Sequence, residues 1–311
     1  QKHTIELNKQ QEVFEFQTTS QADLVVFDAD HYLLADISFE KSDQQWLYQL
    51  ENAPHYYDRM EALDSLVTSE NFVSISRAVK IGLNDTFWAI NTQALEHFKD
   101  VDPKTQGTLE AHLIKLAKSH PKSDVRAAAI NNLSLVFDQN ENMASRSHID
   151  LYTAASSDPS YIVAGDALRA LSILELDAAC LIARKELKSA KKELRDAVFY
   201  VIAKKADPRD AKLIKDEFDL AQGFDILDAT NNLLQFLQKQ QAVDYREPLN
   251  DIYTRCSNLD LWYQRYYALE MINRQLPSIS GEFRDALQVV FKKLIAQEKD
   301  PRVLRYLGIQ K

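Results

Sequence analysis

Glycine and proline are scarce in this chain: among its 311 residues there are 6 glycines and 8 prolines. In average proteins glycine makes up about 7% of the residues and proline about 5%. Both residues interrupt helices, and both are used to build tight turns. Their scarcity predicts a mostly helical fold, and the length allows two domains or one elongated domain.

Long apolar runs are also missing. No run approaches the roughly 18 residues of a membrane-spanning helix, so no membrane span is predicted. The sequence contains no signal peptide, but it begins with Gln1 rather than Met, so we expect its true N-terminus to be missing or processed. A soluble protein is predicted, and both a cytoplasmic and an exported location stay open.

The sequence lacks the motifs of the common catalytic and cofactor sites. A zinc peptidase needs His-Glu-x-x-His on one helix, where two histidines bind the metal and the glutamate activates water. None of the seven histidines is followed by Glu, and the closest pair, His112 and His120, has no third ligand. Glycine-rich phosphate loops and the GxSxG motif are absent too. We therefore predict no catalytic residue, no metal ligand and no cofactor in this chain.

Cysteine is nearly absent. Cys180 and Cys256 form neither a CxxC motif nor a disulfide framework. Cys180 lies in an apolar stretch, where a buried and inert thiol is favoured over a nucleophile.

Positive charge is in deficit, since the formal net charge is −9. Nucleic-acid binding needs a positive field that replaces the counterions on phosphates, so no nucleic-acid partner is predicted. One stretch, residues 185–215, is rich in lysine and arginine. It can be interpreted as a surface for an anion or an acidic partner. Acidic residues are interspersed, however, and this pattern favours a solvated helix face.

Residues 11–39 show the period-2 alternation of β-strands, with β-branched and aromatic side chains at alternate positions. The three segments are QEVFEFQ, LVVFD and LLADISF. Three strands are close to the lower limit for an independently stable sheet. We therefore expect residues 1–41 to be a short β-sandwich remnant that docks on the helices or pairs with another copy.

The pattern changes to the helical period at residue 42. Ser42 and Gln45 have the spacing of a capping box, and Pro54 is expected to end the first helix. Apolar stripes at helical spacing follow, for example Val125, Ala129, Leu133 and Val136. We expect about sixteen helices in residues 42–311.

Four Asp-Pro pairs predict helix starts, because Asp suits the N-cap and Pro suits the first helical position. The prolines are Pro103, Pro159, Pro208 and Pro301. The sequence of residues 124–129, Asp-Val-Arg-Ala-Ala-Ala, resembles a HEAT-type repeat, but no strict repeat period is present. The predicted fold is therefore mainly α, an irregular HEAT-like α-α superhelix preceded by the β-sandwich remnant.

Two aromatic clusters are the candidate interaction sites. The first consists of Trp262, Tyr263, Arg265, Tyr266 and Tyr267. The second consists of Tyr56, Tyr57 and Arg59. Four aromatic side chains within six helical residues cannot all face one core stripe. One interpretation is a peptide-binding wall, because aromatic and arginine side chains dominate binding energy at interfaces. Packing between helices is the favoured alternative for both clusters.

Residues 11–66, taken as an ordered set of short pieces, resemble a junction in zinc metallopeptidases of the aminopeptidase N type, which are gluzincins. The pieces are Phe14-Glu15-Phe16, Val25-Val26-Phe27-Asp28, Leu34, Ser38-Phe39-Glu40-Lys41-Ser42, Trp46-Leu47-Tyr48-Gln49-Leu50, and Arg59 with Ala62-Leu63. In that family a small β-sandwich ends at this junction and a C-terminal helical domain begins. Residues 67–311 are similar to that domain in architecture only.

The resemblance implies that the chain is the non-catalytic C-terminal part of an enzyme that removes N-terminal residues from peptides. The helical domain would then cap the active site and shape the substrate channel. Its partners would be its own upstream catalytic domain, which would hold the zinc, and the peptide substrate. For this chain alone we expect no peptidase activity and no stoichiometric zinc.

A stand-alone α-solenoid scaffold, which binds proteins along its surface without catalysis, is the alternative. The incomplete sheet favours the peptidase interpretation, because free-standing proteins seldom leave a strand edge unpaired.

Overall fold

The computed structural model describes residues 2–20, 22–35, 37–138, 145–188, 191–240 and 245–309, and the side chains of 136–138 are not included in the description. The chain divides into two compact units, Gln1–Glu110 (unit 1) and Ala111–Lys311 (unit 2). The described residues contain sixteen α-helices and no β-strand, so the predicted mainly α fold and the predicted number of helices are confirmed.

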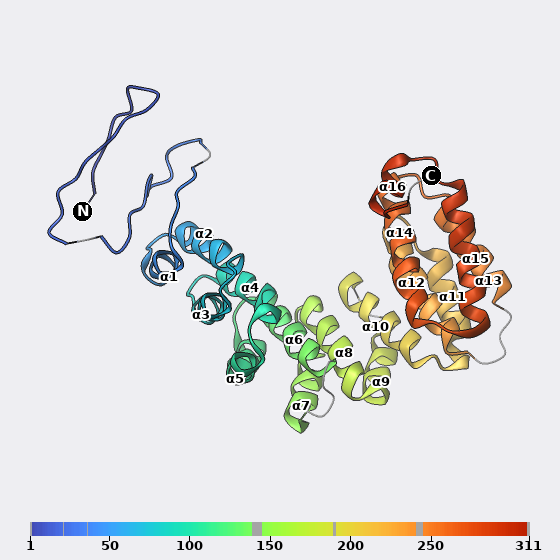
Figure 1. Cartoon of the computed structure of the whole chain (residues 1–311). Coiled ribbons are helices and arrows are strands. Elements are labelled where there is room, and N and C mark those ends of the chain that lie inside the picture. Colours follow the sequence, from blue (N-terminus) through green and yellow to red (C-terminus); the bar gives the residue numbers. More distant parts are fainter. Residues whose placement is uncertain are drawn as a thin grey trace. The chain divides into compact units, whose positions relative to one another are not determined.

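Unit 1 is built from two rows of helices. The helices are α1 (Asp43–Asn52), α2 (Tyr56–Val67), α3 (Phe72–Gly82) and α4 (Trp88–Glu96), followed by the short 3₁₀ helix η1 (Phe98–Asp100) and the start of α5 (Pro103–Ser119). Helix α1 packs on α2 and α3, while α2 and α3 both pack on α4. Odd-numbered and even-numbered helices therefore form separate layers, which can be followed in Figure 1.

Unit 2 has the same alternation within itself, with longer rows. Its even-numbered helices contact one another in series, from α6 to α8, α10, α12, α14 and α16. The helices of this row are α6 (Ser123–Asp138), α8 (Tyr161–Leu174), α10 (Lys192–Lys205), α12 (Asp225–Gln238), α14 (Trp262–Gln275) and α16 (Pro301–Tyr306). The helices that pack against it are α7 (Arg146–Ala155), α9 (Leu176–Glu186), α11 (Ala211–Leu220), α13 (Arg246–Ser257) and α15 (Gly281–Gln297), with 3₁₀ turns η3 (Pro208–Asp210) and η4 (Leu276–Ser278).

The helix starts are set by local capping. The hydroxyl of Ser42 accepts a hydrogen bond from the backbone N–H of Gln45. The side-chain oxygen of Gln45 in turn accepts from the backbone N–H of Ser42, so the predicted capping box is confirmed. Pro103, Pro208 and Pro301 each open a helix or a 3₁₀ turn as predicted. Pro159 does not: α8 begins at Tyr161, two residues later, although the Asp158 carboxylate accepts from the Ser160 N–H just as Asp207 and Asp300 accept from the N–H two residues on.

A buried Ala-Leu or Ala-Ile pair recurs in the even-numbered helices of both units. It occupies the seventh and eighth residues of α2, α4, α6, α8 and α14. The pairs are Ala62-Leu63, Ala94-Leu95, Ala129-Ile130, Ala167-Leu168 and Ala268-Leu269, all of them buried. The small alanine allows a neighbouring helix to approach closely. At Gly82, for example, an added Cβ would lie 2.8 Å from the Cβ of Ala94.

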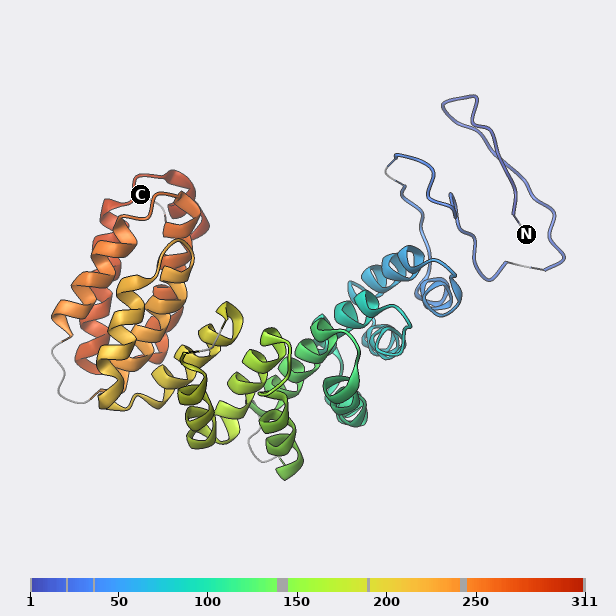
Figure 2. The ribbon, with the colours of Figure 1, turned by 180° about the vertical axis from the view of Figure 1, so that it is seen from behind.

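Residues 2–41 do not confirm the predicted β-sandwich remnant. In both ribbon views the described parts of this segment are coil (Figures 1 and 2), and none of its described residues is in a strand. Its alternating apolar side chains stay exposed, among them Val13, Val25, Leu33, Leu34 and Phe39. A strand needs a neighbour that pairs with its backbone, and no described residue supplies one. The apolar side chains of the period-2 pattern therefore pack against no second layer among the described residues.

A tight turn at residues 28–33 brings His31 into contact with α2. The carboxylate of Asp28 accepts hydrogen bonds from the backbone N–H of Tyr32 and of Leu33, at 3.1 and 2.8 Å. Both Asp28 and His31 adopt positive φ angles, of 49° and 54°. The ring of His31 then lies 2.9 Å from the buried carboxylate of Asp58 and edge-on to Tyr57.

Candidate interaction surface and the repeated arginine clamp

Arg265, one of the candidate site residues, is fully engaged within unit 2. Its Nη1 donates to the carbonyl oxygens of Leu259 and Asp260, at 2.9 and 3.0 Å. Its Nε and Nη2 donate to the two carboxylate oxygens of Glu298, at 2.8 and 3.3 Å. Glu298 also accepts from the backbone N–H of Asp300 at 2.8 Å. The guanidinium therefore links the turn before α14 to the turn before α16.

The same clamp occurs twice more. Arg59 binds the carbonyls of Ala53 and Pro54 and forms two hydrogen bonds with Asp85. Arg126 binds the carbonyls of His120 and Pro121 and forms two hydrogen bonds with Asp158. In all three cases the arginine is the fourth residue of its helix. The acid lies three residues before the next helix of the even-numbered row.

The arginine clamps stabilise the charged form of their acids, as the pKa values of Glu298 and Asp158 show. Burial by itself would raise the pKa of Glu298, but the hydrogen bonds from Arg265 and from backbone amides outweigh it and hold the pKa below its usual value. The pKa of Asp158 is lowered for the same reasons. Because most of their donors are occupied, Arg59 and Arg265 position turns between helix pairs and present little hydrogen-bonding capacity to a ligand.

Helix α10 shows what happens when the acid is missing. It also has an arginine at its fourth position, Arg195, but the residue three before α12 is Gln222. Arg195 instead pairs with Glu217 on α11. The clamp therefore depends on the pair of charges rather than on the helix geometry alone.

The aromatic residues of the first cluster lie on one surface of unit 2, and they join rings from two neighbouring helices. We call this set the aromatic surface: Phe224, Trp262, Tyr263, Tyr266, Tyr267 and Tyr306. Trp262 stacks on Tyr306 with ring centroids 5.9 Å apart and planes at 14°. Tyr263 stacks on Phe224 at 5.7 Å and 16°. The six rings form an unbroken series of contacts across the even-numbered row.

The rings pack on one another and still remain open to solvent. Tyr306 is 63% exposed, Phe224 51% and Tyr267 48%, and Trp262 is half-buried. Arg302 lies over the face of Trp262, with its Cζ 4.4 Å from the ring centroid. Among the described residues, no side-chain hydrogen bond joins Trp262 or Tyr306 to a partner. The same rings therefore pack between helices and are partly exposed to solvent.

The second cluster lies in unit 1. Tyr56 and Tyr57 are the first and second residues of α2, the positions that Trp262 and Tyr263 occupy in α14. Tyr56 contacts Phe87 with centroids 4.6 Å apart, and Tyr57 is 57% exposed beside His31. The two clusters therefore arise from one repeated helix-start pattern. The repetition of Arg-x-x-Ala-Leu at residues 59–63 and 265–269 is the signal that relates them in the sequence.

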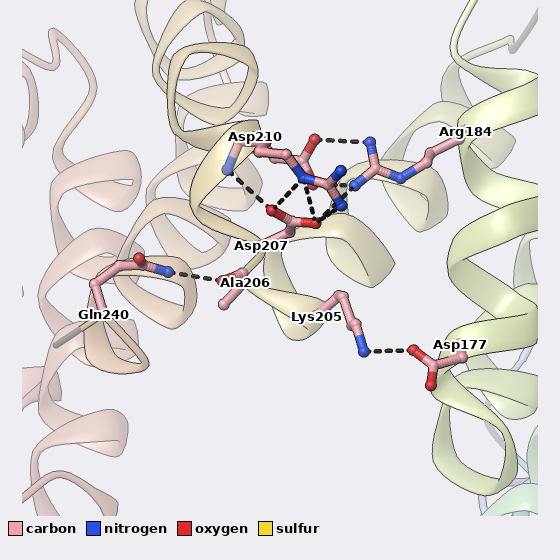
Figure 3. A network of polar contacts seen from close by, with 8 residues as sticks. Asp177, Arg184, Lys205, Ala206, Asp207, Asp210 and Gln240 are labelled. Carbon is pink, nitrogen blue, oxygen red and sulfur yellow. Dashed lines mark hydrogen bonds and ion pairs between the residues drawn. The ribbon is translucent and has the colours of Figure 1, made fainter.

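The basic stretch of unit 2 is largely neutralised. Six of its cations pair with acids: Lys192, Arg195, Lys205, Arg209, Lys212 and Lys215. Figure 3 shows the centre of this region, where Arg184 forms two hydrogen bonds with Asp210 and Lys205 pairs with Asp177. Hydrogen bonds from Arg209 lower the pKa of Asp207. The ion pairs agree with the favoured interpretation, a solvated helix face.

The same network fixes a strained helix end. Ala206 ends α10 in the left-handed conformation, with φ of 54°, and its carbonyl accepts from the side chain of Gln240 at 2.8 Å (Figure 3). Left-handed geometry is unfavourable for a residue with a Cβ, so the contacts around this turn hold it in place.

Groups of metal-ligand type are dispersed in the part of the chain that the structure describes: no three His, Cys, Asp or Glu side chains come together. Burial raises the pKa of Cys256 to about 12. Over the same described ranges, every helix is too short or too polar to cross a membrane. No protein-family model matches the chain, and the search of curated proteins found no similar sequence.

Proposed function

We propose that this chain is a non-catalytic helical-repeat module that binds a polypeptide segment on the aromatic surface of α12, α14 and α16. The observation that carries the proposal is the unbroken series of six rings, which combines exposed apolar faces with polar edges. Aromatic side chains give large contact area at small entropic cost, and such residues dominate binding energy at protein interfaces.

The architecture that presents this surface is proposed to be an irregular HEAT-like superhelix. The support comes from the two-layered packing of helix pairs and from the three clamps of Arg59, Arg126 and Arg265, which recur at one position of the helix pair. Stacked helix pairs of this type bury a continuous core and leave extended surfaces for partners.

An array of immobilised twelve-residue peptides, probed with the full chain, tests the proposed function. We expect a subset of peptides to bind, and we expect W262A and Y306A to reduce that binding at least fivefold. Tyr161→Ala is the matched control, because Tyr161 is also an exposed aromatic residue at the start of an even-numbered helix. Equal binding by W262A, Y306A and Y161A would rule out the aromatic surface as the site.

A second proposal places the module in a larger enzyme, as the C-terminal part of a zinc aminopeptidase of the aminopeptidase N type. There the helical module would cap the active site and shape the peptide channel, and the zinc would be bound by the catalytic domain. The observation that favours this setting is the uncovered period-2 pattern of residues 11–39, which matches strands whose neighbours lie outside the described residues.

The coding sequence on the 5′ side of the Gln1 codon tests this setting directly. An upstream His-Glu-x-x-His, with a second Glu about 20 residues further on, is the expected result for a gluzincin. A start codon immediately before Gln1 would remove the proposal and leave the stand-alone scaffold. The isolated chain is expected to have no activity on aminoacyl anilides and no bound zinc.

A further inference from the structure

A cleft of about 650 Å³ lies in unit 1 between the C-terminal ends of α1 and α3. Its lining combines partly exposed apolar side chains, Ala53 and Ile81, with two cations of α3, Arg77 and Lys80. Ligand sites in proteins commonly have volumes of about 300 to 1,000 Å³ and pair an apolar lining with a few polar groups. The cleft therefore has the size and composition of a small binding site.

Unit 2 contains an equivalent cleft, and comparing the two clefts separates the features they share from those found in unit 1 alone. That cleft, of about 580 Å³, lies between α13 and α15 and is bordered by the clamp of Arg265 and Glu298. The unit 1 cleft is bordered in the same way by Arg59 and Asp85. The hollow itself is thus a product of the helix-pair geometry, and any specificity has to come from the side chains that differ.

The unit 1 cleft differs by its unpaired cations. Arg77 and Lys80 are one helical turn apart on α3 and both are exposed. Among the described residues, neither forms an ion pair or a side-chain hydrogen bond. Residues 1–110 contain only 8 Lys and Arg against 19 Asp and Glu. Two cations have thus stayed without a counterion in a strongly acidic unit, and both line the same cleft.

The other charges of the lining leave a positive balance. Arg59 and Asp85 neutralise each other at 2.6 Å. Glu51 is the one remaining acid in the lining, against the two cations of α3. An anionic group is therefore the complementary ligand, and an exposed guanidinium with an ammonium nearby offers charge-assisted hydrogen bonds to carboxylates.

We propose that the unit 1 cleft binds an acidic peptide segment. Its carboxylates bind to Arg77 and Lys80, and an adjacent apolar side chain packs on Ala53 and Ile81. The apolar part of the lining favours a peptide over a bare anion, because an inorganic ion has no group to place there. This site is separate from the aromatic surface and does not depend on the function proposed for it.

Fluorescence anisotropy of a labelled peptide, Ac-EELEEL-amide, with the full chain tests the proposal. We expect saturable binding in 50 mM salt that weakens in 500 mM salt, as screening requires. The double variant R77A/K80A should weaken binding at least tenfold, and E51Q should tighten it because a repelling charge is removed. Both replaced cations are exposed and unpaired, so the variant should keep the thermal unfolding midpoint of the parent.

Two control variants isolate the cleft from general charge effects. Lys104→Ala removes another exposed cation of unit 1, and Lys299→Ala removes the cation of the equivalent cleft in unit 2. Both should bind the peptide as the parent does, and W262A should do the same. The proposal is overturned if the parent does not bind, or if R77A/K80A binds as tightly as the parent. Equal binding of Ac-KKLKKL-amide, or displacement by millimolar inorganic phosphate alone, would overturn it as well.

Discussion

Replacing Arg265 by alanine should destabilise unit 2 because it removes the clamp between two turns. Four hydrogen bonds from the charged guanidinium are lost, and two of them go to the carboxylate of Glu298; hydrogen bonds to charged groups are each worth about 1.5 to 3 kcal/mol. The Glu298 side chain is only 4% exposed, and removing one partner of a buried ion pair typically costs about 3 to 5 kcal/mol.

Two features of the site reduce this cost. The Arg265 side chain is 21% exposed, so solvent screens part of the attraction. Glu298 also keeps its hydrogen bonds from the backbone N–H groups of Lys299 and Asp300. We therefore expect R265A to lower the free energy of unfolding by about 2 to 4 kcal/mol.

Urea unfolding followed by circular dichroism at 222 nm measures this loss. With a denaturant dependence of about 2 to 3 kcal/mol per molar, the midpoint should fall by about 1 M. Arg274→Ala is the matched control on the same helix, because Arg274 is 76% exposed and pairs only with Glu270 one turn away, where about 0.5 kcal/mol is expected. If R265A and R274A lose the same stability, the structural role of the clamp is refuted.

The clamp also predicts how this loss depends on pH. The folded-state pKa of Glu298 is lowered, so its contribution is fully present above the usual glutamate value of 4.5 and is lost as the pH falls through the lower folded-state value. The stability difference between the parent and R265A should therefore be largest near pH 7 and shrink below about pH 4.5. A difference that grows on acidification would contradict the assignment.

Three further substitutions or reactions test particular contacts. Gly165→Ala should cost about 1 to 3 kcal/mol by urea unfolding, because its Cβ would lie 2.8 Å from the carbonyl oxygen of Glu193, whereas Gly107→Ala has open space and should not destabilise. Ala206→Gly should raise stability by up to about 1 kcal/mol, because glycine adopts the left-handed end of α10 without strain; a lower midpoint would contradict this. Cys256, whose pKa is raised to about 12 by burial, should react with Ellman's reagent at pH 8 only after unfolding, and rapid reaction of the native protein would contradict its burial.

Helix positions could be predicted from the sequence because their signals are local. The Ser42 capping box and three of the four Asp-Pro starts depend on hydrogen bonds within a few residues, and the structure contains them. Asp158-Pro159 does not open a helix; the Asp158 carboxylate accepts from the nearby N–H of Ser160 and also binds the guanidinium of Arg126. The second partner is 32 residues away in the sequence, and a local pattern contains no information about it.

The roles of Arg59 and Arg265 could not be predicted for the same reason. Their acids lie 26 and 33 residues downstream, so the pairing becomes visible only when helix pairs are stacked. Repetition of the motif is a signal that comparison of the helices within the chain can detect. The repeated motif is hard to recognise because two helices lack the arginine: the fourth residue is Asn91 in α4 and Ala164 in α8. The buried Ala-Leu pair is nevertheless present in both helices.

The internal repetition weakens one part of the resemblance to aminopeptidases. Arg59 with Ala62-Leu63 was one of its pieces, yet the same pattern returns at Arg265 with Ala268-Leu269 in α14. A pattern that the chain repeats for its own packing has little power to single out one family. The pieces between residues 11 and 42 have no such duplicate, and most of their apolar side chains are exposed, among them Val25, Leu34 and Phe39. Whatever covers these side chains in the cell therefore discriminates between a peptidase part and a free scaffold far better than any feature of the helices.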